Sequence, residues 1–398
     1  MKDIWSQFKT IINKFRDLTF FSTATIVTNG IGGVFWLYMA SLLGTEGYGE
    51  ISYIISIAVI SSTISLAGMS NIIIVYSAKN IKIQSTVFLI GLISSGITAT
   101  IIFFFIAKDV TISLYIIGFV MYTLVTAELI GRKLFFKYSK IIVVQKIFLI
   151  IFSIILYHLI GLQGIVLGIS LSFLIFGFIL YQSFKEIKID FSIFKGRYRF
   201  AINSFLLDIS LAFNGSLDKI IIVPLLGFSL LGNYQLGLQF ISLAYLVPGM
   251  LFAYILTHDS SGNSTKFIKR IIITISIVIT IITIILSPIL VPILFPKFLE
   301  AIVVIQIMSI GIIPSAIVST YISKYLGAAN SKIVIIGSGI FLGIQIISII
   351  ILGNIYGLNG VAVSGAISVF IHMVYFVMID RFQNKSQSTT GIQKNINH

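Results

Sequence analysis

The chain has 398 residues, of which 57% are hydrophobic and 10% are charged, and its mean hydropathy is +1.07. Soluble domains have about 45–50% apolar and about 25% charged residues, so this composition excludes a water-soluble protein. The absence of cysteine excludes disulfides and thiolate metal sites. The four scattered histidines form no ligand pair, and no glycine-rich phosphate loop is present. We therefore expect no metal, no cofactor and no enzymatic activity.

The apolar runs predict an all-α polytopic membrane protein. A helix needs roughly 20 apolar residues to cross a 30 Å hydrocarbon core, and twelve runs meet that length. Runs such as 271–285 do not alternate between apolar and polar residues as a membrane β-strand would. In chain order the predicted spans are 18–43, 50–76, 85–107, 110–131, 141–160, 162–184, 200–226, 233–257, 268–294, 299–323, 332–354 and 359–380.

The basic residues predict the orientation of these spans. Of the 27 Lys and Arg residues, 24 are assigned to one side of the membrane, Lys108 and Lys297 to the other, and Lys219 to the interior of a span. Cytoplasmic loops collect Lys and Arg, so both termini are expected in the cytoplasm. The net charge of +14 is then a topology signal combined with attraction to anionic lipid headgroups of the bilayer. Nucleic-acid binding is not expected.

Two internal matches divide the chain into halves. Residues 43–49 match 226–232 at an offset of 183, and 161–165 match 357–361 at an offset of 196. Six spans starting from the same side in each half predict a parallel pseudo-two-fold repeat of two six-helix bundles. The expected organisation is an interfacial amphipathic helix (1–17), an N-terminal lobe (18–184), a basic cytoplasmic linker (185–199), a C-terminal lobe (200–380) and a cytoplasmic tail (381–398).

Polar side chains on three spans predict the lining of a central path. Span seven carries two adjacent polar rows at helical spacing, one with Asn214 and Asp218 and the other with Asp208 and Lys219. The equivalent span one carries Asn29, and span eight carries Gln235 and Gln239. Two GxxxG pairs, Gly164 with Gly168 and Gly339 with Gly343, predict close helix packing instead.

Three charges on span seven are expected to matter most, because a charge at the bilayer centre costs roughly 2.5–3.5 kcal/mol. Asp218 and Lys219 are neighbours that point about 100° apart on a helix, so the partner of Lys219 is expected on another helix, in water or on an anionic substrate. Two interpretations stay open, a structural pair between helices and participation in substrate or ion coupling. Without an ATP site, net transport requires consumption of the product or a coupled H+ or Na+, and Asp208 or Asp218 would bind that ion.

Three segments carry a resemblance to a known family. The segments are Leu-Leu-Gly-Thr-Glu-Gly-Tyr-Gly at 42–49, Asp-Lys-Ile-Ile-Ile-Val-Pro-Leu-Leu-Gly at 218–227 continuing to Gly-Asn-Tyr at 232–234, and Tyr-Gly-Leu-Asn-Gly at 356–360. With the basic amphipathic start and the half repeat, the chain resembles polysaccharide transporters of the MOP superfamily, and within them the bacterial O-antigen flippases (Wzx).

This resemblance implies a MATE-like pair of V-shaped lobes in the bacterial inner membrane. It implies alternating-access translocation of an undecaprenyl-pyrophosphate-linked oligosaccharide, alongside other O-antigen assembly proteins. Asp218 and Lys219 would face the substrate path, and Arg197 and Arg199 would lie at its cytoplasmic rim. Lys219 is the one deeply placed cation that the sequence indicates, so the headgroup would be bound by that lysine with the rim residues or mainly by hydrogen bonds.

Two other functions stay open. An ion-coupled multidrug or cation exporter of the same superfamily would share the twelve-span architecture, although acidic residues in the predicted path are few. A membrane glycan polymerase would be expected to carry a sizeable outer loop, whereas no predicted outer loop exceeds roughly eight residues. The related lipid II flippases have fourteen spans, against the twelve expected here.

Overall fold

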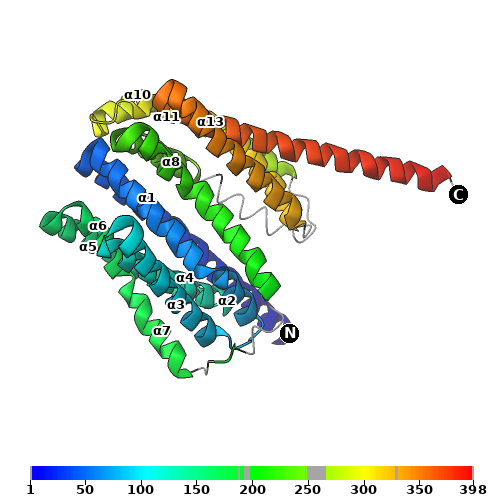
Figure 1. The fold of residues 1–398 in the computed structure, drawn as a ribbon. Helices are drawn as coiled ribbons and strands as arrows, with labels where there is room; N and C mark the ends of the chain where they lie inside the picture. Colours follow the sequence, from blue (N-terminus) through cyan, green and yellow to red (C-terminus); the bar gives the residue numbers. More distant parts are fainter. Residues whose placement is uncertain are drawn as a thin grey trace. The chain divides into compact units, whose positions relative to one another are not determined.

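A computed structural model describes residues 2–186, 189–191, 198–246, 248, 266–327 and 330–396. The side chains of 2–23, 26, 186, 198–199, 266–268, 331 and 384–396 lie outside that description. Helices dominate these ranges, which contain no strand (Figure 1). In chain order the helices are α1 (Lys2–Leu66), α2 (Met69–Ala78), α3 (Gln84–Ile102), the π-helix η1 (Phe103–Ala107), α4 (Val110–Gly131), α5 (Phe135–Ile160), α6 (Leu162–Ser172), α7 (Leu174–Glu186), α8 (Tyr198–Ala244), α10 (Lys266–Leu294), α11 (Ala301–Ile310), α12 (Ile312–Gly327) and α13 (Ser331–Ile396).

The predicted all-α polytopic class is confirmed. Within the described ranges eight helices are long and apolar enough to cross a membrane, or nine if the bent pair α11 and α12 is one span. Three of them, α1, α8 and α13, contain a glycine with non-helical backbone angles, at Gly44, Gly227 and Gly357. Divided at these glycines, the helices account for the twelve predicted spans. For the eighth span, only 233–246 and 248 are described.

The chain forms two compact units. The first unit contains Met1–Met39 and Glu50–Ile220, and the second contains Ala40–Gly49 and Ile221–His398. The division falls inside α1 and α8, so the first part of α8 packs with the N-terminal helices. The lobe boundaries at 184 and 200, and the linker between them, stay predictions.

Glycines at equivalent positions support the predicted repeat. Gly44 and Gly227, which are 183 residues apart, both have positive φ values of 73° and 83°. Gly161 and Gly357, which are 196 residues apart, have φ values of 72° and 58°. Positive φ is readily available to glycine and strained for other residues, so each half bends its chain at the same two points.

A reciprocal contact joins the first matched pair of segments within the second unit. A Cβ atom built on Gly49 would lie 1.9 Å from the carbonyl oxygen of Phe228, and one built on Gly232 would lie 1.9 Å from the carbonyl oxygen of Thr45. The offset of 183 relates Thr45 to Phe228 and Gly49 to Gly232. The two contacts are therefore the same contact made in both directions. In each one, the glycine of one half touches the residue that corresponds to Thr45 or Phe228 in the other half.

The GxxxG predictions have different outcomes. A Cβ on Gly164 would lie 2.1 Å from the carbonyl oxygen of Leu156, and one on Gly168 would lie 2.4 Å from the backbone nitrogen of Ser153. This pair therefore packs α6 closely against α5, as predicted. Gly339 and Gly343 have no described atom within 4 Å of an added Cβ, so the prediction of close packing at that pair is wrong for the described part of the chain.

Candidate functional site

Asp208 of α8 binds the beginning of α2 inside the first unit. The chain breaks between α1 and α2, where Ala67 and Gly68 have positive φ values of 46° and 76°. Just beyond the break, the Ser70 hydroxyl donates to Asp208 at 3.0 Å and the Asn71 amide donates to it at 2.9 Å. A Cβ on Gly68 would lie 2.4 Å from the carbonyl oxygen of Ala201, so glycine allows α8 to approach this break closely.

Among the described residues, no positive side chain balances the charge of the Asp208 carboxylate. The donors Ser70 and Asn71 are both neutral, and no described Lys, Arg or His lies within 4.0 Å of the carboxylate. The positive end of the α2 dipole lies beside it and favours the ionised form modestly. A half-buried carboxylate of this kind is suited to exchange a proton or a small cation.

Asp218 and Lys219 are both buried and form an ion pair with each other. The Lys219 ammonium lies 3.7 Å from Asp218 Oδ1 and also donates to the carbonyl oxygen of Gly215. The expectation that Lys219 needs a partner outside its own helix is therefore wrong. The long lysine side chain folds back along α8, so the 100° angle between the two Cα–Cβ directions does not keep the charged ends apart.

Removing one member of this pair is expected to destabilise the protein. Lys219→Met removes the ammonium that lies 3.7 Å from the buried Asp218 carboxylate, so we expect the free energy of unfolding to fall by about 3 kcal/mol. The double variant Asp218→Asn/Lys219→Met should recover most of that loss because both charges of the pair are removed together. Thermal denaturation in detergent measures the stability of the single and of the double variant. Equal melting temperatures for the two variants would contradict the pairing.

Lys146 is a second intramembrane cation that the sequence analysis missed. It was assigned to the cytoplasmic loops, but the structure places it near the middle of α5. An added Cβ on Gly32 of α1 would lie 3.5 Å from the Lys146 ammonium. Lys219 is therefore not the one deeply placed cation of the chain. The signal that could have identified Lys146 was its position inside the predicted span 141–160.

The remaining predicted site residues are distributed over both units. Asn29 and Asn214 are exposed residues of the first unit, on α1 and α8. Gln235 and Gln239 are half-buried residues of the second unit, and Gln235 lies beside the buried hydroxyl of Tyr48. Arg199 belongs to the first turn of α8, but its side chain and all of Arg197 lie outside the described residues. The described residues contain no cluster of three or more His, Asp or Glu side chains that could hold a metal ion.

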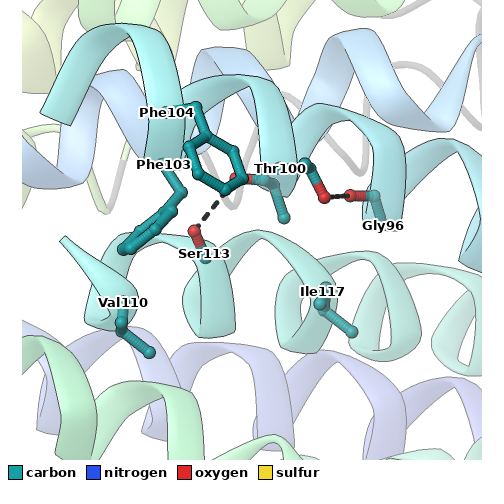
Figure 2. A pocket seen from close by; sticks show the side chains of 8 residues that line it. Gly96, Thr100, Phe103, Phe104, Val110, Ser113 and Ile117 are labelled. Atoms are coloured by element: carbon teal, nitrogen blue, oxygen red, sulfur yellow. Dashed lines mark hydrogen bonds between the residues drawn. The ribbon is translucent and has the colours of Figure 1, made fainter. Parts of the chain in front are cut away.

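The described cavities do not include any of these residues. A cavity of about 410 Å³ lies between α3, η1 and α4 and is lined mainly by apolar groups such as Phe103, Phe104 and Ile117 (Figure 2). Its two hydroxyls are used internally, because Ser113 donates to the carbonyl oxygen of Ala99 at 3.0 Å and Thr100 to that of Gly96 at 2.8 Å. This cavity presents an apolar wall without free polar groups, which suits lipid chains better than sugars.

Comparison with known proteins shows which solved structures have a similar fold. No protein-family profile and no curated protein sequence matches the chain. Among solved structures, the lipid II flippase MurJ in an inward closed conformation matches with a TM-score of 0.76 and 17% identity, over 91% of this chain and 87% of that chain. An inward-facing MATE family multidrug resistance transporter of the MOP superfamily matches with a TM-score of 0.71 and 13% identity, over 92% and 96%.

A third similar structure is a MOP superfamily transporter from Pyrococcus furiosus, with a TM-score of 0.56 and 12% identity over 92% of this chain and 95% of that chain. At such low identity these likenesses concern the fold. They agree with the apolar helices, which are long enough to cross a membrane several times. The chain is a multi-pass α-helical membrane protein whose fold is similar to that of the MurJ flippase and of MOP superfamily transporters.

Proposed function

We propose that this protein is a flippase that moves an undecaprenyl-pyrophosphate-linked oligosaccharide, such as an O-antigen repeat unit, across the bacterial cytoplasmic membrane by alternating access. The observation that carries the proposal is the set of charged residues within the membrane, Asp208, Asp218 and Lys219 on α8 and Lys146 on α5. These occur in a fold that is similar to a lipid flippase over 91% of the chain. The sequence resemblance at 42–49, 218–234 and 356–360 supports the choice of substrate.

Physical chemistry explains why such a substrate requires polar residues in the membrane. A pyrophosphate and several sugars drawn through hydrocarbon would leave many polar groups without hydrogen bonds, at several kcal/mol each. Polar residues within the membrane, for which Asn29, Asn214, Gln235 and Gln239 are the candidates, would replace their water, while the prenyl chain stays in lipid. Arg197 and Arg199 would attract the pyrophosphate at the cytoplasmic rim, and both termini would lie in the cytoplasm.

The coupling ion is proposed to bind Asp208. Of the two acids considered from the sequence, Asp218 is paired with Lys219 at 3.7 Å, whereas Asp208 has neutral hydrogen-bond donors. A carboxylate whose charge is not balanced by a neighbour is the better acceptor for H+ or Na+. Other O-antigen assembly proteins would supply the lipid-linked unit and remove it from the outer leaflet.

Deletion of the gene tests the proposed function. We expect completed lipid-linked repeat units to accumulate inside the cell and the surface glycan to disappear, and a plasmid copy to restore both. The measurement is the profile of surface glycan and of lipid-linked intermediates. Single repeat units on the surface that never lengthen would point to a polymerase and contradict the proposal. An unchanged glycan profile would also contradict it.

An ion-coupled multidrug or cation exporter is the second candidate. It is favoured by the unbalanced Asp208 carboxylate and by the likeness to a multidrug resistance MATE transporter. Sensitivity of the deletion strain to organic cations, with unchanged surface glycan, would favour the exporter.

A further inference from the structure

The cavity between α3, η1 and α4 lies at the surface of the first unit. Phe104 and Val110, which line it, are 63% and 56% exposed. None of the five residues of η1 is buried, and Phe105 is 82% exposed. An apolar wall offers water no hydrogen-bond partners. Because α3 with η1 and α4 are both long and apolar enough to cross a membrane, lipid hydrocarbon is the material that fills this cavity there.

The cavity extends along the two helices away from the connection between them. Gly96 and Ile117 lie at one end of it, and Phe103 and Val110 lie at the other end, next to the connection (Figure 2). Seven residues separate the two ends on each helix, which corresponds to about 10 Å. One leaflet contributes about 15 Å to the hydrocarbon core. The cavity therefore has a length that suits the acyl chain of a lipid in a single leaflet, with the headgroup at the connection.

Gly96 keeps the deeper end of the cavity open. No described atom lies within 4 Å of a Cβ added at this glycine. At the other end, α3 changes into the π-helix η1, a rare geometry that is frequent at functional sites. A bound acyl chain would supply the packing atoms that the described protein does not place beside Gly96.

Two opposite charges lie next to each other in the connection. Lys108 and Asp109 join η1 to α4 and directly precede Val110 of the cavity wall. Asp109 is the N-cap of α4, and its Oδ1 accepts from the backbone nitrogen and from the hydroxyl of Thr111, both at 2.7 Å. No ion pair of 4.0 Å or less joins Lys108 and Asp109 to each other or to another described residue. The connection therefore offers an ammonium group and a carboxylate oxygen, Oδ2, separately to a ligand.

We infer that this cavity binds an acyl chain of phosphatidylethanolamine, with Lys108 at the lipid phosphate and Asp109 at the lipid ammonium group. Both headgroup contacts are charge-assisted hydrogen bonds. The two charges of the connection sum to zero, so they complement a zwitterionic headgroup. The headgroup of phosphatidylglycerol has no cation for Asp109, and the quaternary ammonium of phosphatidylcholine has no N–H to donate. The site is separate from the proposed transport function and does not depend on the transported substrate.

Native mass spectrometry of the purified full chain tests the headgroup assignment. The protein is measured in micelles that contain equal amounts of phosphatidylethanolamine, phosphatidylglycerol and phosphatidylcholine with identical acyl chains. We expect the wild type to retain phosphatidylethanolamine best. Asp109→Asn should lower the ratio of retained phosphatidylethanolamine to phosphatidylglycerol by about threefold, the contribution of one ion pair at a wet surface. Asparagine is as good an N-cap as aspartate, so α4 should stay folded.

Lys108→Asn should lower the retention of all three lipids, because each of them carries the phosphate. Lys108 has a positive φ of 47°, and asparagine adopts this left-handed conformation more readily than most residues. The matched control is Lys297→Asn, which removes the other lysine predicted on the outer side and should retain lipids as the wild type does.

A second pair of variants tests the cavity and leaves the headgroup contacts in place. Gly96→Phe should lower lipid retention to the level of Lys108→Asn, because its ring occupies the space of the acyl chain. Gly343→Phe is the control, since Gly343 also has no described atom within 4 Å of an added Cβ but belongs to α13.

Three results would overturn the proposal. The first is a wild type that retains the three lipids equally or retains phosphatidylglycerol best, since the connection would then not select a zwitterion. The second is an unchanged ratio of phosphatidylethanolamine to phosphatidylglycerol in Asp109→Asn. The third is wild-type retention in Gly96→Phe, since the acyl chain would then lie elsewhere.

Discussion

Gly232→Val is expected to abolish recovery of folded protein. The first atom of the new side chain would lie 1.9 Å from the carbonyl oxygen of Thr45 and 2.7 Å from its carbonyl carbon. These are backbone atoms, which cannot turn aside as the end of a flexible side chain can. We expect the free energy of unfolding to fall by more than about 4 kcal/mol, a loss that is typical of substitutions that disrupt the core severely. Fluorescence-detected size-exclusion chromatography of the solubilised protein measures the outcome.

Gly49→Val should have the same effect because its contact with Phe228 is equally close. Gly343→Ala is the matched control, since Gly343 lies within α13 and no described atom lies within 4 Å of its added Cβ. We expect that variant to keep or slightly raise the melting temperature, because alanine is the better helix former. A monodisperse Gly232→Val protein with a wild-type melting temperature would refute the reciprocal contact.

Asp208→Asn is expected to remove the ion dependence of translocation while the protein stays folded. Asparagine has nearly the shape of aspartate and retains an acceptor for Ser70 or Asn71, but it has no charge with which to hold H+ or Na+. We expect the rate in proteoliposomes with an imposed ion gradient to fall at least about tenfold, a change of 1.4 kcal/mol in the barrier. The measurement is movement of a fluorescent lipid-linked oligosaccharide between leaflets.

Asn71→Ala is the control for this experiment. It removes the donor that lies 2.9 Å from Asp208 but keeps the carboxylate, so translocation should still respond to the gradient. If wild-type translocation is unchanged when both the proton and the sodium gradients are collapsed, Asp208 has no coupling role. Its two hydrogen bonds to α2 would then serve only to fix the inner part of α8.

The sequence predicted the spans well because hydropathy and helix length are properties of single segments. The spans at 110–131 and 162–184 agree closely with α4 and with α6 followed by α7. The repeat was also visible, because its matched glycines carry positive φ values that other residues adopt at a cost. Its reciprocal contact was not visible, because a match between two segments does not reveal that they touch.

The candidate site was predicted less completely, since its contacts depend on tertiary structure. Asp208 was singled out as a charge within a span, but its donors Ser70 and Asn71 are 138 and 137 residues away in sequence. The pairing of Asp218 with Lys219 was missed because helical geometry fixes the Cβ direction and leaves the four-carbon lysine chain free to bend. Lys146 was missed because charges were sorted by loop, although its own side chain lies beside the middle of α1.

The reciprocal contact of Gly49 and Gly232 has a consequence for how a chain of this kind can arise. The glycine of each half touches the same position of the other half. A symmetric dimer with an isologous interface has this arrangement, because both subunits use the same surface patch. A half-length polypeptide with one such glycine at its first hairpin would already carry a surface complementary to its own copy, provided that both copies insert in the same orientation. Fusion of two such genes would preserve this contact without requiring any new one, and each half could afterwards diverge around it.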